Sequence, residues 1–100
     1  MIQHVVMWKV KGESTEERQA NANALAATLQ SLRGKIPALQ SLEVGLSSIE
    51  GPQACDLVLI TQHESWEALD GYQTHPEHQA IAPTVMRLTR ERRFVDYERH

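Results

Sequence analysis

The sequence predicts an α+β domain in which four strands and two helical regions follow one another in the order βαββαβ. Two observations carry this prediction. Four segments show the apolar alternation or the β-branched enrichment of strands, and two others place apolar residues at helical spacing behind a capping residue. A length of 100 residues suits one domain over residues 1–100. The order is that of the ferredoxin-like fold, a four-stranded antiparallel sheet with its helices on one face.

The first strand and the first helix are predicted in the opening third of the chain. Residues 2–11 (IQHVVMWKVK) are rich in valine and contain no breaker, as is typical of a strand. Ser14 and Glu17 form a capping box, so a helix is expected to begin there and to run to about Arg33. Gly34 is expected to end this helix in the left-handed conformation that glycine adopts without strain.

Three more strands are predicted at residues 42–46, 57–60 and 92–98. The first of them alternates apolar with small or polar residues, which indicates a half-buried strand. The second (LVLI) is apolar on both faces. The third (RRFVDYE) combines aromatic and β-branched residues with charged ones.

The helical region between the last two strands is predicted to be interrupted. Ser65 is the candidate N-cap of a short helix that carries Tyr72. Pro76 disfavours helical geometry at His75 and suits the first turn of a new helix. Pro83 is expected to break this second helix.

Composition and charge argue against several classes of protein. The net charge of −3 argues against a nucleic-acid binder. Cys55 is the only cysteine, which predicts a reducing compartment, the cytoplasm. No signal peptide precedes the first strand, and no apolar run approaches the ~20 residues that span a bilayer, so no membrane partner is expected. The late arginines are interleaved with acidic residues, as on a solvated surface: Arg87, Arg90, Arg92, Arg93 and Arg99.

The sheet is predicted to bury both of its faces. On the first strand, Val6, Trp8 and Val10 point to one face, whereas Val5 and Met7 point to the other. The helices can cover only one face. At ~25 cal/mol per Å² of apolar area, leaving the second face in water would forfeit several kcal/mol. We therefore predict a C2 homodimer formed through this open face.

Several segments together resemble the stress-responsive dimeric α/β-barrel family, abbreviated Dabb: HVVMWKVK, IPALQSLEVG, CDLVLI, ESWEALDGYQTHPEH and RFVDYE. The resemblance covers essentially the whole chain. It implies ferredoxin-like protomers whose sheets pair into a dimeric α/β barrel, with a loose link to stress response. Its most specific residues are Tyr72, His75, Pro76 and His78, together with His4 and Asp96.

One branch of that family, similar to plant olivetolic acid cyclase, implies a candidate site. That branch performs an aldol-type cyclisation of linear polyketides without a metal or organic cofactor. By this resemblance His78 is the base and Tyr72 the acid. His4 and Asp96 belong to the same site.

The residues themselves suit this chemistry. An imidazole titrates near neutrality and can take a proton next to a carbonyl, and a phenol can donate to the oxygen on which charge develops. A carboxylate on the other imidazole nitrogen fixes the tautomer and raises basicity, and Asp96 can supply it. Because His4 shares a strand face with Trp8, the site is expected between sheet and helices, with His75 and Trp8 as substrate contacts.

Several functions remain open at this stage. The first is a homodimer that binds a small carbonyl-type ligand, and the second is a cofactor-free, cyclase-like enzyme. The third is a non-catalytic stress protein in which Tyr72 and His78 are hydrogen-bonded structural residues. An oxygen-dependent monooxygenase has no identifiable residues here. His75 and His78 are also spaced as a metal pair, but only His4 or His63 is left to complete the ligand set, so no metal is predicted.

Overall fold

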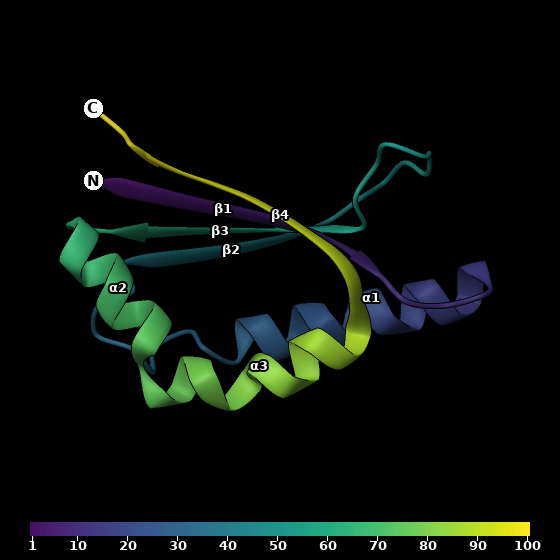
Figure 1. The fold of residues 1–100 in the computed structure, drawn as a ribbon, viewed down its shortest axis with the longest axis horizontal. Helices are drawn as coiled ribbons and strands as arrows, with labels where there is room; N and C mark the ends of the chain where they lie inside the picture. The colour runs from purple at the N-terminus through teal and green to yellow at the C-terminus, as the bar shows by residue number, and fades with distance from the viewer.

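The computed structural model describes residues 1–100 and confirms the βαββαβ order, with the second helical region divided in two (Figure 1). The strands pair antiparallel in the order β2-β3-β1-β4, which is the ferredoxin-like fold. The elements are β1 (Ile2–Val10), α1 (Thr15–Gln30), β2 (Ser41–Leu46), β3 (Leu57–His63), α2 (Trp66–Thr74), α3 (Pro76–Leu88) and β4 (Thr89–Glu98).

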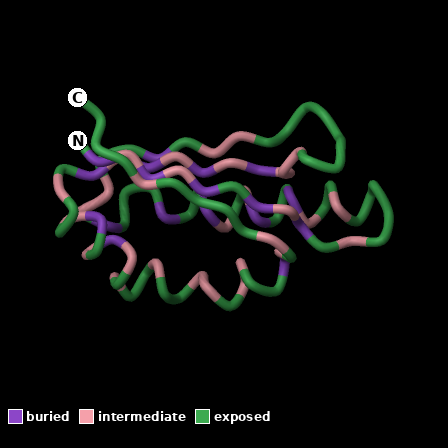
Figure 2. The backbone as a smooth tube through the Cα atoms, turned by 45° about the horizontal axis from the view of Figure 1, so that its top comes forward, coloured by how far each residue is buried: buried purple, intermediate pink, exposed green.

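The three helices lie on one face of the sheet, and the core fills the space between them (Figure 1). The buried stretches run along the central strands and the inner sides of α1 and α2, while α3 is buried only at Leu88 and β4 stays largely exposed (Figure 2). Val6, Leu25 and Leu57 are among the fully buried residues that join sheet to helix. None of the helices combines the length and the apolar character that crossing a bilayer requires.

The first helix begins as predicted. Ser14 Oγ accepts a hydrogen bond from the backbone N–H of Glu17 at 3.1 Å, and the Glu17 carboxylate accepts one from the N–H of Glu13 at 3.0 Å. The helix ends at Gln30, earlier than the predicted end near Arg33, with Ser31 rather than Gly34 at the cap position, and a turn follows in which Gly34 has φ 80°. This positive φ is the left-handed conformation expected of that glycine.

The prediction that Pro83 breaks the second helix is wrong, because α3 runs without interruption through Pro83 to Leu88. An interior proline removes one N–H donor and crowds the carbonyl four residues earlier, at a cost of about 3 kcal/mol. On either side of it, Ile81 and Val85 pack against the core, and this burial holds the helix together. Two strands are also longer than predicted: β3 continues beyond Ile60 to His63, and β4 begins before Arg92, at Thr89.

The face of the sheet opposite the helices carries an apolar band. Val5 lies opposite Ile60 on one neighbouring strand and opposite Val95 on the other. Met7, Val95 and Tyr97 expose 38%, 50% and 42% of their surface. No helix covers this band, in agreement with the alternation that predicted a second apolar face.

Candidate functional site

A pocket of about 200 Å³ lies between the sheet and α3. Strand alternation places its sheet residues, from β1, β3 and β4, on one face of the sheet, and helical spacing places most of its helix residues on one face of α3, with Leu29 coming from α1. Most of the lining is apolar, and its three polar members are His4, His78 and Arg92. The apolar lining consists of Val6, Trp8, Leu29, Leu59, Ile81, Ala82, Val85 and Met86.

His4 and Asp96 form the first polar pair of the site. They are register partners on β1 and β4, and the Nδ1 of His4 contacts the Oδ1 of Asp96. An ionised carboxylate only accepts hydrogen bonds, so Nδ1 is assigned the proton and Nε2 is the free nitrogen. His4 is buried and Asp96 is half-buried. The carboxylate of Asp96 therefore orients His4 rather than His78.

Tyr72 lies behind the pocket, with its ring surrounded by three imidazoles. Its ring centroid is 4.7 Å from that of His78, 4.8 Å from that of His63 and 6.3 Å from that of His4. The side chain is 0% exposed, and its hydroxyl has no hydrogen-bond partner in the chain. Burial raises the pKa of Tyr72 to about 12, so the phenol keeps its proton at neutral pH.

His78 stands in the first turns of α3 and lines the pocket directly. Burial lowers the pKa of His78, and the charges of His4 and Arg92 nearby lower it further. The ring is therefore neutral at pH 7. It meets Tyr72 edge-on, at an interplanar angle of 71°.

His75 has a capping position in the structure. Its Nδ1 accepts from the backbone N–H of Glu77 at 3.1 Å, and Pro76 follows it as the first residue of α3. His75 does not line the pocket, whereas Trp8, the other predicted substrate contact, does. No group of three or more His, Cys, Asp or Glu side chains is arranged to hold a metal ion.

Thr61 and His63 are buried polar residues that the sequence analysis did not place in the site. His63 Nδ1 donates to the carbonyl of Ala38 at 2.8 Å, so Nε2 accepts from the hydroxyl of Thr61, also at 2.8 Å. Burial lowers the pKa of His63, and the hydrogen bond to the carbonyl of Ala38 raises it by a smaller amount. Both ring nitrogens are used, so His63 is a satisfied structural residue behind Tyr72.

One protein-family model matches almost the whole sequence. The Stress responsive A/B Barrel Domain (Dabb) matches residues 2–99. The chain belongs to the Dabb family. No curated protein matches the sequence.

Solved structures share this Dabb fold. A dimeric protein of ferredoxin-like fold from Bacteroides fragilis is 26% identical, with a TM-score of 0.82, over 97% of this chain and 94% of that chain. A Dabb family protein from Mesorhizobium loti is 18% identical, with a TM-score of 0.71, over 99% of this chain and 96% of that one. A hydroxynitrile lyase from Passiflora edulis is 15% identical, with a TM-score of 0.77, over 96% and 90%.

The sequence of this Dabb protein contains signals that could have placed Thr61, His63 and Arg92 on the helix side of the sheet. Thr61 and His63 continue the inward alternation of Leu57 and Leu59, which only a longer β3 reveals. Arg92 lies opposite Trp8 on β1 and so shares its face. Its place among alternating charges had indicated only a solvated surface.

Proposed function

We propose that this Dabb protein is a homodimer that binds a small carbonyl compound in the pocket between the sheet and α3. One observation carries the proposal: two imidazoles, His4 and His78, converge on an otherwise apolar pocket. An apolar pocket with a few convergent polar groups and a lowered histidine pKa is the usual form of a small-molecule site.

The pocket size supports a small ligand. Sites for drug-sized ligands span roughly 300–1,000 Å³, and this pocket is about 200 Å³. A long linear polyketide fits such a volume poorly, so the size favours a compact carbonyl compound over the cyclase-like alternative.

The enzymatic alternative assigns each polar group a step. Neutral His78 takes a proton from the carbon next to the carbonyl. Tyr72 is a protonated donor, but it does not line the pocket. Its hydroxyl therefore reaches a ligand oxygen only after these rings shift. His4, oriented by Asp96, lines the same pocket as His78.

Two features favour a ligand site over the purely structural alternative. That alternative expects Tyr72 and His78 to be hydrogen-bonded, yet the Tyr72 hydroxyl has no partner. Native proteins rarely bury a hydroxyl in this state. That a hydroxynitrile lyase shares the fold supports an enzymatic role at the level of the scaffold alone.

The homodimer is proposed to form through the open face of the sheet. The band around Val5, Ile60 and Val95 is apolar and uncovered, and relatives such as the Bacteroides fragilis protein are dimeric. Packing a second copy on this face gives the self-complementary contact of a C2 dimer. The single cysteine, Cys55, supports a cytoplasmic setting for this dimer.

Titration with acetophenone, an apolar carbonyl compound, tests the pocket. We expect saturable NMR shifts of His78 in the wild-type protein. Ala82→Leu should abolish them, because Ala82 lines the pocket and the larger side chain fills it. The matched control, Ala80→Leu, makes the same change on the exposed side of α3 and should bind like wild type. If the His78 shifts are equal in both variants, or if they do not saturate with acetophenone, the ligand-site proposal fails and the structural alternative remains.

A further inference from the structure

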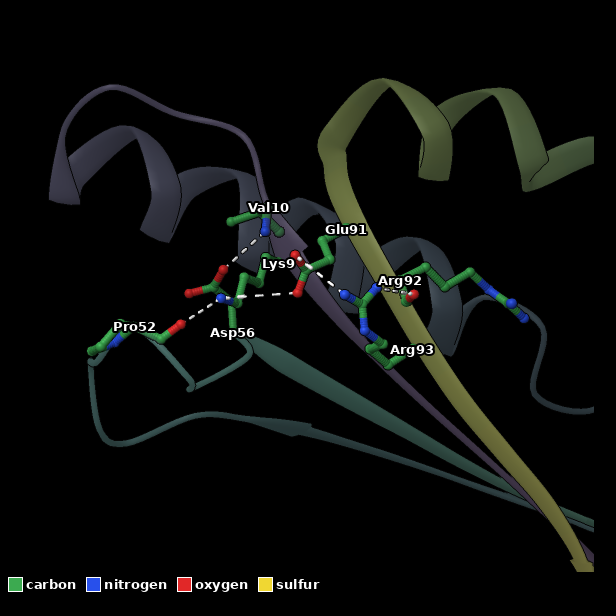
Figure 3. Close-up of polar contacts among 7 residues, drawn as sticks. All are labelled: Lys9, Val10, Pro52, Asp56, Glu91, Arg92 and Arg93. Carbon is green, nitrogen blue, oxygen red and sulfur yellow. Dashed lines mark hydrogen bonds and ion pairs between the residues drawn. The ribbon is translucent and has the colours of Figure 1, made fainter.

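Arg92 is the only arginine or lysine among the residues that line the pocket. It lies on β4 opposite Trp8, at the exposed edge of the lining. The residues beside it belong to another cluster: Glu91 pairs with Lys9 at 3.9 Å and with Arg93 at 3.7 Å. Arg92 points away from this cluster (Figure 3).

The guanidinium of Arg92 is held in place without an acidic partner. None of the four ion pairs of the structure includes it. Its Cζ lies 4.8 Å from the ring centroid of Phe94, a cation–π contact that orients the side chain. Asp96, the acidic residue of the site, is occupied by His4. The pocket mouth therefore presents a positioned and unneutralised guanidinium.

We propose that the ligand of this pocket is an oxo acid, whose apolar body fills the pocket and whose carboxylate is bound by Arg92 at the mouth. This inference rests on the proposed function, since it names the class of carbonyl compound bound there. A guanidinium offers parallel N–H donors that match the two oxygens of a carboxylate. With the carboxylate at Arg92, the body of the ligand extends inward toward His4 and His78.

The surroundings favour a carboxylate over a phosphate group. Arg92 is the only lysine or arginine that lines the pocket, and the remaining lining is apolar apart from two imidazoles. A phosphate with nearly two negative charges needs more donors than one guanidinium to replace its hydration. A single carboxylate is matched by one guanidinium.

A pair of matched ligands tests this inference. Benzoylpropionate is an aromatic oxo acid, and benzoylpropionamide replaces its carboxylate by an uncharged amide. Calorimetric titration of the wild-type protein should give at least about tenfold tighter binding of the acid, as a charged hydrogen-bonded pair contributes. Arg92→Gln should remove this preference and leave the binding of the amide unchanged.

Arg93→Gln is the matched control, because it removes the same charge from the adjacent residue on the other face of β4. It should keep the preference for the acid. Equal binding of acid and amide by the wild type would overturn the oxo-acid inference while the pocket proposal stands. An equal loss in both arginine variants would overturn it too, since net charge alone would then explain the preference. If neither ligand binds, the proposed function fails and the inference fails with it. If inorganic phosphate competes with benzoylpropionate for the wild-type protein but not for Arg92→Gln, Arg92 forms an anion site without selectivity for carboxylates. That result would overturn the oxo-acid inference.

Discussion

Replacing Tyr72 by phenylalanine is expected to stabilise the free protein at neutral pH. The hydroxyl is buried without a partner, and an unsatisfied buried polar group costs roughly 1–3 kcal/mol. Phenylalanine keeps the ring between the imidazoles and removes that cost. We therefore expect Tyr72→Phe to raise the free energy of unfolding by about 1 kcal/mol or more at pH 7.

The same substitution should alter stability at alkaline pH. Burial raises the pKa of Tyr72 from 10.0 to about 12, so the folded protein holds a proton that the unfolded chain releases. The protonated phenol makes its full contribution to the free energy of unfolding below pH 10, and this contribution is lost as the pH rises toward 12. At about 1.4 kcal/mol per pKa unit, the loss amounts to roughly 3 kcal/mol. Tyr72→Phe should lack this loss.

Urea unfolding at fixed protein concentration, repeated from pH 7 upward, measures both effects. The control is Tyr97→Phe, which removes an exposed hydroxyl bonded to Gln3 Nε2 at 2.8 Å. That variant should keep the alkaline loss. If Tyr72→Phe instead destabilises the protein by more than 1 kcal/mol at pH 7, the hydroxyl has a partner within the protein. The case for a donor kept for a ligand would then be refuted.

Two further results are expected. Lowering the pH from 7 to 5 should weaken the fold, because burial lowers the pKa of His63 and of His78, and the unfolded chain then takes up protons that the folded protein does not. His63→Gln should reduce this dependence in urea midpoints and leave the part due to His78, and an unchanged slope would contradict the assignment. Val95→Glu places a charge on the open face and should give a monomer by light scattering. The control Met86→Glu alters an exposed residue of α3 and should stay dimeric, and a dimeric Val95→Glu would rule out the open-face interface.

The fold was predictable because each element carries its own periodic signal. The apolar residues of β1 and β3 recur at a period of two, and the caps of α1 and α2 are local. The failure at Pro83 has a different origin. Local preference favoured a break there, but the packing of Ile81 and Val85 against the core decided the conformation.

The site was predictable only in part, since its contacts depend on register between distant strands. The sequence placed His4 on the helix side of the sheet, but pairing it with Asp96 requires knowing that β1 and β4 are neighbours in that register. The role of Arg92 depends on the same register. A shift of one residue would turn its side chain to the other face.

The alternation of β4 links the proposed dimer to the proposed site. Arg92 and Asp96 lie on the helix side of the sheet, where Arg92 lines the pocket, whereas Val95 and Tyr97 face the open side. β4 is an edge strand with β1 as its only neighbour in the sheet, and it is largely exposed. A partner packed on its open side would restrict its motion, and so fix the carboxylate and the guanidinium on its other side. A monomeric Val95→Glu variant should therefore bind benzoylpropionate more weakly than wild type, although the substituted side chain lies outside the pocket. Equal affinity in the monomer would show that the site is complete within one chain.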